Sequence, residues 1–185
     1  MRVIIGGVFS GIIRDAMIAA GHDAWSCDLL PSERKGPHYQ CDVRTIMNQN
    51  WDLGIFHPDC THLAVSGARW FPQKRADGRQ HEAIAFFMEM VNAPIDMIAV
   101  EQPISIMSTL YRKPDQIIQP WMFGHGETKA TCLWLKNLPL LVPTNIVPGR
   151  ENWIHRMPPG ENRWRERSRT YPGIAQAMAE QWGKP

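Results

Sequence analysis

Short apolar runs alternate with helix-like stretches over the first hundred residues of the chain. The runs have the length of buried strands and lie at residues 3–8, 23–27, 39–43, 52–56 and 95–100. The stretches between them predict helices over residues 12–20, 44–50 and 79–92. Because this alternation is typical of βαβ units, we expect an α/β fold, with a mostly parallel sheet and helices on both faces.

The C-terminal part follows a different pattern. Residues 116–145 are rich in proline and tryptophan, and they contain one predicted strand, at 130–135. Residues 173–182 have the composition of a helix that closes the chain. We expect this helix to pack back on the sheet.

A basic segment rich in arginine and tryptophan lies at about residues 145–171. Residues 150–169 hold six Arg and three Glu, a local net charge of +3. Arginine occupies alternate positions, at Arg163, Arg165, Arg167 and Arg169. In an extended chain, alternate side chains share one face, so this segment predicts a strip of positive charge. Salt bridges to acidic neighbours are the alternative use of these side chains.

Length and composition place limits on the class of protein. A chain of 185 residues with 44% apolar and 21% charged residues is typical of one globular domain, which we expect over residues 1–185. No apolar run approaches the roughly 18 residues of a transmembrane helix, so we expect no membrane partner. The N-terminus has the pattern of a first strand and turn rather than of a signal peptide. Four cysteines without a C-x-x-C pair predict reduced thiols and a cytoplasmic protein.

One short spacing could suggest a metal site. His57, Cys60 and His62 form an H-x-x-C-x-H pattern, but the sequence offers no obvious fourth ligand for zinc. Pro58 and Asp59 between them fit a loop. We therefore expect no metal at this place.

Polar and glycine residues follow the predicted strands, where open parallel sheets bind ligands. A glycine turn, Phe9-Ser10-Gly11, follows the first strand and would let the backbone approach a ligand. Asp28 follows the second strand and could accept hydrogen bonds from ribose hydroxyls, and Asp42 follows the third and could bind an exocyclic amine. Together these residues predict a nucleoside site. A generic tight turn is the alternative for residues 9–11, since no G-x-G-x-x-G is present.

Two further strand ends carry reactive groups. Cys60 lies in the loop after the fourth strand, where nearby positive charge could favour a nucleophilic thiolate. Glu101 follows the fifth strand and would face the same crevice, unless it is solvated or caps the next helix. For the remaining cysteines we expect the commoner fate of a small core residue. They are Cys27, Cys41 and Cys132.

The order of these residues resembles the motifs of the cytosine-5 DNA methyltransferases. The matching segments are F-S-G, Asp28, Asp42, Pro58-Asp59-Cys60 and Glu101-Gln102-Pro103. The spacing Cys60-x5-Ser66-Gly67 is similar to the family pattern as well. The chain most resembles short methyltransferase-like proteins of phages and prophages, over nearly its whole length. The stretches FGHGETKATCLWLKNLP and IHRMPPG belong to this closer resemblance.

The resemblance implies a Rossmann-like methyltransferase fold and transfer of a methyl group from S-adenosyl-L-methionine to carbon 5 of cytosine in DNA. Cys60 would add to carbon 6 of the ring, and Glu101 would hydrogen-bond the ring nitrogen and the exocyclic amine. The cytosine would be flipped out or single-stranded, in the cytoplasm of a bacterial host. The implied cofactor residues are Phe9, Ser10, Gly11, Asp28, Asp42 and Pro58. The implied nucleic-acid contacts are Lys129, Arg163, Arg165, Arg167 and Arg169, with Trp153 and Trp164 available for stacking.

Three positions depart from the family pattern. Ile13 replaces the second glycine of F-x-G-x-G, Asp59 replaces a proline, and Gln102 replaces an asparagine. A neighbouring carboxylate disfavours a thiolate, so Asp59 opposes the activation of Cys60. The sequence also shows no large target-recognition domain, so a partner protein could supply target recognition.

Two alternatives to a DNA methyltransferase stay open. One is a methyltransferase-like protein that binds nucleic acid or nucleotides without turnover. The other is a methyltransferase that acts on a free pyrimidine nucleotide or on RNA. An ordinary dinucleotide oxidoreductase is disfavoured because the phosphate-loop glycines are absent.

Overall fold

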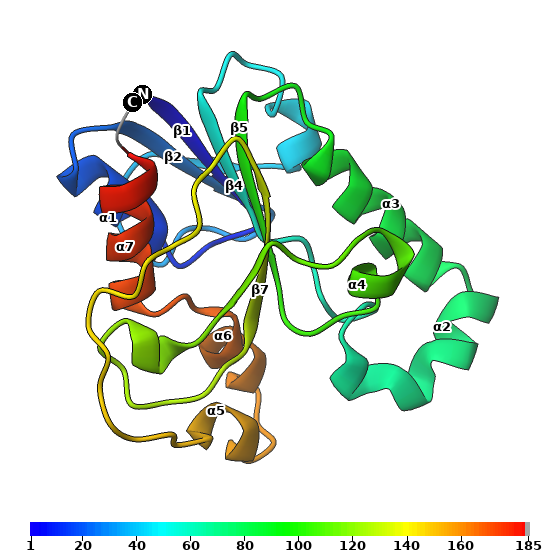
Figure 1. Ribbon diagram of the computed structural model, residues 1–185. Coiled ribbons are helices and arrows are strands. Elements are labelled where there is room, and N and C mark those ends of the chain that lie inside the picture. The colour runs from blue at the N-terminus through cyan, green and yellow to red at the C-terminus, as the bar shows by residue number, and fades with distance from the viewer. Residues whose placement is uncertain (184–185) are drawn as a thin grey trace.

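The computed structural model describes residues 1–183, and a seven-stranded sheet forms its centre (Figure 1). The strands run in the order β3-β2-β1-β4-β5-β7-β6. Neighbours among the first five are parallel, whereas β7 runs antiparallel to both β5 and β6. Their bounds are Arg2–Gly6 (β1), Asp23–Asp28 (β2), His38–Gln40 (β3), Leu53–Phe56 (β4), Met97–Gln102 (β5), Gln116–Ile118 (β6) and Thr131–Lys136 (β7).

Helices cover both faces of the sheet. In Figure 1, α1 and α7 lie side by side on one face and α3 lies on the other. The α-helices are Ile12–Ala19 (α1), Phe71–Ala76 (α2), Arg79–Val91 (α3), Met107–Leu110 (α4), Trp153–Arg156 (α5), Arg163–Ser168 (α6) and Pro172–Trp182 (α7). Three short 3-10 turns span Val43–Thr45, Val65–Trp70 and Pro120–Met122.

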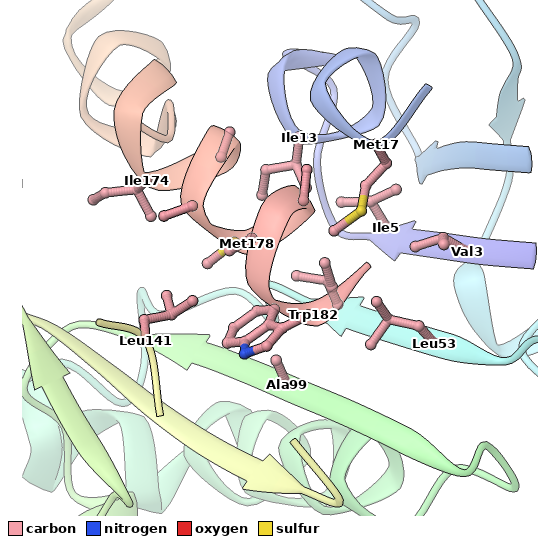
Figure 2. Close-up of a cluster of buried hydrophobic side chains, with 14 of the residues drawn as sticks. Val3, Ile5, Ile13, Met17, Leu53, Ala99, Leu141, Ile174, Met178 and Trp182 are labelled. Carbon is pink, nitrogen blue, oxygen red and sulfur yellow. The ribbon is translucent and has the colours of Figure 1, made fainter. Parts of the chain in front are cut away.

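Alternating side chains of the strands build two cores. Val3 and Ile5 of β1 point towards α1 and α7, where Met178 and Trp182 complete the cluster (Figure 2). Ile4, between them, faces α3 on the opposite side. Because both faces are buried, the central strands are apolar at nearly every position, as parallel sheets require.

The expected α/β fold is confirmed. The order β3-β2-β1-β4-β5 is that of a nucleotide-binding Rossmann sheet, and the antiparallel β7 beside β5 gives the Rossmann-like methyltransferase fold. The closing helix also packs on the sheet beside α1, as expected. Within the described residues, no helix has the length and apolar character needed to cross a membrane.

Three local expectations are wrong. Residues 44–50 form only a 3-10 turn, because buried Ile46 and Trp51 draw the chain inward and Asn50 adopts a left-handed conformation with φ 56°. The prolines and glycines of residues 57–78 predict a continuous loop, but this stretch contains a 3-10 turn and α2. The arginine segment is not an extended strip.

Residues Arg163–Ser168 form the helix α6 instead. Arginine and glutamate are good helix formers, and Glu166 pairs with Arg169 one turn later. Because the segment is helical, the two-residue alternation of an extended chain does not place the four arginines on one face.

Candidate active site

The carboxyl ends of β1, β2, β4 and β5 meet at one edge of the sheet. The pairing places Gly6 of β1 beside Cys27 of β2 and Phe56 of β4, and Phe56 beside Val100 of β5. The segments that follow these four residues therefore emerge together. They contain the Phe9 turn, Asp28, His57–Cys60 and Glu101.

The loop after β1 is held against its neighbours by backbone contacts. Gly7 has φ 75° and donates its N–H to the Cys27 carbonyl at 2.8 Å, while its α-carbon lies against the His57 carbonyl, where no side chain would fit. Gly11, with φ 72°, precedes α1. Phe9 and Ser10 are both buried, and Ser10 Oγ lies 3.5 Å from the Ile12 N–H.

A fully buried arginine fastens the next loop to this turn. The Arg14 guanidinium donates twice to Asp15 Oδ1, at 2.8 and 2.9 Å, and once each to the Ser26 and Ser32 hydroxyls, at 3.1 and 3.0 Å. It also donates to the carbonyls of residues 34 and 35, at 3.3 and 3.1 Å. Sequence reasoning missed this role, and the only signal was a cation on the apolar side of α1, beside Ile13.

The two predicted cofactor carboxylates have different surroundings. Asp28 accepts a hydrogen bond from the Leu30 N–H at 2.9 Å. Burial raises the pKa of Asp28, although that hydrogen bond and the charge of His38 act in the opposite direction. Asp42 caps the turn at residues 43–45 and forms an ion pair with Arg44, whose hydrogen bonds lower the pKa of Asp42.

The Cys60 loop is tied to the end of β5. The side-chain amide of buried Gln102 donates a short hydrogen bond to the Pro58 carbonyl. Asp59 accepts hydrogen bonds from the Thr61 N–H and hydroxyl, at 2.9 and 2.6 Å. Gln102 thus links the end of β5 to the Cys60 loop. It stands at the position where the motif of the cytosine-5 DNA methyltransferases has an asparagine, which is one methylene shorter.

The Cys60 thiol is held in its neutral form. Burial raises the pKa of Cys60, and the negative charges of Asp59 and Glu101 raise it further. The positive charge of Lys129 acts in the opposite direction. Formation of a thiolate at neutral pH therefore needs further help, from a ligand or a proton acceptor.

Glu101 lies in direct contact with a histidine. Its Oε2 lies 3.1 Å from Nδ1 of His57, and the two side chains are only 15% and 12% exposed. Burial would raise the pKa of Glu101, but His57 and Lys129 outweigh it and lower the pKa. Sequence reasoning considered His57 only as a metal ligand and missed this pair, because the two residues are 44 positions apart.

Lys129 belongs to the same cluster. Glu101 and Cys60 both act on its pKa and partly offset the burial that lowers it. Its Nζ donates to the Arg169 carbonyl at 3.0 Å. The charge of Lys129 therefore acts on Cys60 and Glu101, and its partly buried side chain is not part of an open basic surface.

The helix α6 covers the loop after β1. The rings of Trp164 and Phe9 have centroids 5.5 Å apart, and the Arg165 guanidinium lies 5.6 Å from the Phe9 ring centroid. Glu33 pairs with Arg169 at 2.8 Å and with Arg165 at 3.8 Å. Two of the four arginines predicted to bind nucleic acid are thus paired with acidic neighbours.

Within residues 1–183, no three His, Cys, Asp or Glu side chains are grouped so that they could hold a metal ion. The candidate site consists of one thiol, one carboxylate–histidine pair and one partly buried lysine. They are Cys60, Glu101, His57 and Lys129.

Comparisons with known proteins identify the fold. No family model matches the chain, and no curated protein matches it. A solved structure from E. coli, described as a "putative DNA modification methyltransferase encoded within prophage", matches with a TM-score of 0.54 and 14% sequence identity. The match covers 81% of this chain and 53% of the other, so this chain spans about half the length of that protein. At this identity the likeness establishes a shared fold.

Proposed function

We propose that this protein transfers a methyl group from S-adenosylmethionine to carbon 5 of cytosine in DNA. The observation that carries the proposal is that Cys60 follows β4 and Glu101 lies at the end of the neighbouring parallel strand β5, so that the Glu101 charge acts on the Cys60 thiol. A nucleophilic thiol and a carboxylate are the groups that addition to a pyrimidine ring requires. The similar prophage-encoded structure is named for DNA modification and supports the same class of reaction.

The residues around the β1 loop fit the methyl donor. Gly7 and Gly11 let the backbone approach a ligand closely, and buried Phe9 offers an apolar wall. Among the described residues, no lysine or arginine forms an ion pair with Asp28, so its carboxylate is available to ribose hydroxyls. Asp42 would contribute less through its carboxylate, because Arg44 already occupies it. S-adenosylmethionine would supply the electrophilic methyl group.

In the proposed reaction, Cys60 loses its proton to solvent and its sulfur adds to carbon 6 of cytosine. Glu101 hydrogen-bonds the ring nitrogen and the exocyclic amine, so the electron pair of the ring double bond becomes available at carbon 5. Carbon 5 takes the methyl group, and S-adenosylhomocysteine would be the leaving group. Carbon 5 then loses its proton to solvent, and the bond to sulfur breaks. Because burial and Asp59 oppose the thiolate, we expect deprotonation of Cys60 to depend on bound substrate.

Phosphate contacts would come from the basic segment. The base must leave the duplex to reach Cys60, unless the strand is already single. Exposed Trp153 and Trp164 offer stacking surfaces, and the arginines of α6 lie beside the β1 loop. Arg165 and Arg169 would exchange Glu33 for phosphate on binding.

The direct test is transfer of a tritiated methyl group from S-adenosylmethionine to cytosine-containing DNA, RNA and free nucleotides in parallel. We expect label in DNA, loss of transfer in Cys60→Ser, and donor affinity close to that of the unmodified protein. DNA with 5-fluorocytosine should trap a covalent adduct, because no proton can leave carbon 5. Cys41→Ser is the matched control, since Cys41 lies outside the cluster and should leave transfer intact.

One observation favours a second candidate, a protein that binds donor and nucleic acid without turnover. The raised pKa of Cys60 and the neighbouring Asp59 both oppose its use as a nucleophile. Donor binding without transfer to any substrate, and without a trapped adduct, would support this candidate. Label in RNA or nucleotides alone would instead assign the substrate outside DNA.

A further inference from the structure

His57 occupies a central position in the site, and the proposed reaction gives it no role. It follows β4 directly, and its backbone N–H donates to the Gly6 carbonyl at 2.8 Å. Its carbonyl lies against Gly7, so the backbone at residue 57 is fixed between the β1 loop and the end of β5. From this anchored position the ring reaches Glu101 Oε2, with a distance of 3.1 Å from Nδ1.

The two ring nitrogens have unequal surroundings. Nδ1 contacts Glu101, whereas Nε2 is buried and has no hydrogen-bond partner among the described residues. A histidine that only stabilises a fold normally has both nitrogens satisfied by the protein, since a buried unpaired nitrogen costs free energy. Within residues 1–183 the ring has one partner, a carboxylate, and the other nitrogen is left to a ligand or solvent.

A carboxylate that orients an imidazole is an arrangement suited to proton transfer, because histidine exchanges protons near neutral pH. Glu101 is the group that the proposed reaction places against the cytosine ring. The charge and hydrogen bond of His57 lower the pKa of Glu101, so this carboxyl is ionised at rest. An ionised carboxylate has no proton of its own to give to a ring nitrogen.

We propose that His57 is the positioning residue that holds Glu101 and supplies the proton which Glu101 delivers to the ring nitrogen N3 of cytosine. This inference rests on the proposed function. When Cys60 adds to carbon 6, the ring double-bond electrons shift towards N3. The Nδ1–H bond of protonated His57 breaks, a proton passes by way of Oε2 of Glu101, and an N3–H bond forms. Neutral His57 and ionised Glu101 remain.

The proton returns by the same path at the end of the reaction. When carbon 5 has lost its proton and the bond to sulfur breaks, N3 gives its proton back through Glu101 to His57. The thiolate that leaves carbon 6 takes up a proton from solvent, which replaces the one that Cys60 lost at the start. The only proton released overall is therefore the one from carbon 5. No oxidant or reductant takes part.

Lys129 is a weaker candidate for the same task. Its Nζ donates to the Arg169 carbonyl at 3.0 Å, and no contact with Glu101 within hydrogen-bond distance is present. It acts on Glu101 through its charge. Besides His57, the charge that acts on this carboxyl comes from Lys129. The Glu101 carboxylate in turn raises the pKa of Cys60 and of Cys132.

The test compares His57→Asn with the unmodified enzyme. Asparagine can keep a hydrogen-bond donor towards Glu101, but it cannot carry a titrating proton. We expect kcat for methyl transfer to fall by about 10²- to 10⁴-fold, the usual contribution of general acid–base groups. KM for DNA and the donor affinity should stay within about threefold, since neither depends on the proton.

Two further readouts separate proton transfer from a structural role. The 5-fluorocytosine adduct should form more slowly in His57→Asn, because N3 gains its proton during that step. Added imidazole should restore part of kcat in His57→Ala, and the pH dependence of kcat should change with the variant. His62→Asn is the matched control, because His62 lies in the same loop and also has a buried nitrogen without a partner.

The results distinguish the inference from the proposed function. If the unmodified enzyme methylates DNA and His57→Asn retains its kcat and its rate of adduct formation, the role of His57 is wrong and the proposed function stands. A loss confined to donor or DNA affinity would also overturn the role. If the unmodified protein methylates no cytosine substrate, the proposed function and the role of His57 both fail.

Discussion

Replacement of Arg14 by Met removes the guanidinium that joins α1 to the loop of residues 29–37. The side chain is fully buried and makes six hydrogen bonds. Bonds to charged groups contribute about 1.5–3 kcal/mol each, but the sum overstates the cost. Asp15 is 34% exposed and can be rehydrated, and Ser26 keeps its contact with His38.

The carbonyl of Lys35 has no other partner among the described hydrogen bonds, and the loop loses its main attachment. We therefore expect a loss of about 3 kcal/mol in the free energy of unfolding, at the lower end of values for broken buried pairs. For a chain of this length, about 2–4 °C per kcal/mol predicts a fall in Tm of about 6–12 °C.

Urea and thermal unfolding measure the loss, and limited trypsin digestion measures loop opening. Trypsin should cut after Arg34 or Lys35 faster in Arg14→Met than in the unmodified protein. Arg34→Met is the matched control for stability, because Arg34 is 51% exposed and pairs with Asp15 at 3.3 Å, so its loss should cost less than about 1 kcal/mol. A cost below about 1 kcal/mol for Arg14→Met, with unchanged digestion, would refute the role of Arg14 in holding the loop.

Three further predictions concern the core and the attachment of α6. Trp182→Ala should cost about 3–5 kcal/mol in urea unfolding, because the ring is buried and donates to the Pro139 carbonyl, whereas exposed Trp153→Ala should cost little. Glu33→Gln should release α6 and shift the fluorescence of Trp164, with no shift expected if α6 is held by ring contacts alone. Arg169 and the other nearby arginines lower the pKa of Glu33, so the ion pair should hold α6 above the ordinary Glu pKa of about 4.3 and be lost as pH falls below it. A titration of Trp164 fluorescence should show this loss. An identical titration in Glu33→Gln would contradict it.

The alternation of apolar runs and helical stretches was sufficient to predict the parallel part of the sheet. The central strands β1, β4 and β5 are buried on both faces, so nearly all of their residues are apolar. The sites at the strand ends followed from the same pattern. Once β4 and β5 are parallel neighbours, Cys60 and Glu101 must emerge at one edge.

The contacts within the site depend on the tertiary structure. His57 and Glu101 are a pair only because β4 and β5 are adjacent and end at matching positions. Glu33 meets Arg169 across 136 residues, because α6 folds over the β1 loop. Local periodicity reports whether a position is buried, but it carries no information on which distant side chain satisfies a buried charge.

The arginine segment and Arg14 show this difference most clearly. The alternation of arginines at residues 163–169 was compatible with an extended segment and also with a helix. The segment forms a helix, in which Trp164 packs on Phe9 of the β1 loop. Arg14 had the appearance of one polar residue on an amphipathic helix. The sequence alone determined the fold class and the strand-end residues, because burial is encoded residue by residue. The pairing of charges, by contrast, was decided by tertiary packing, because each partner is supplied by a distant segment.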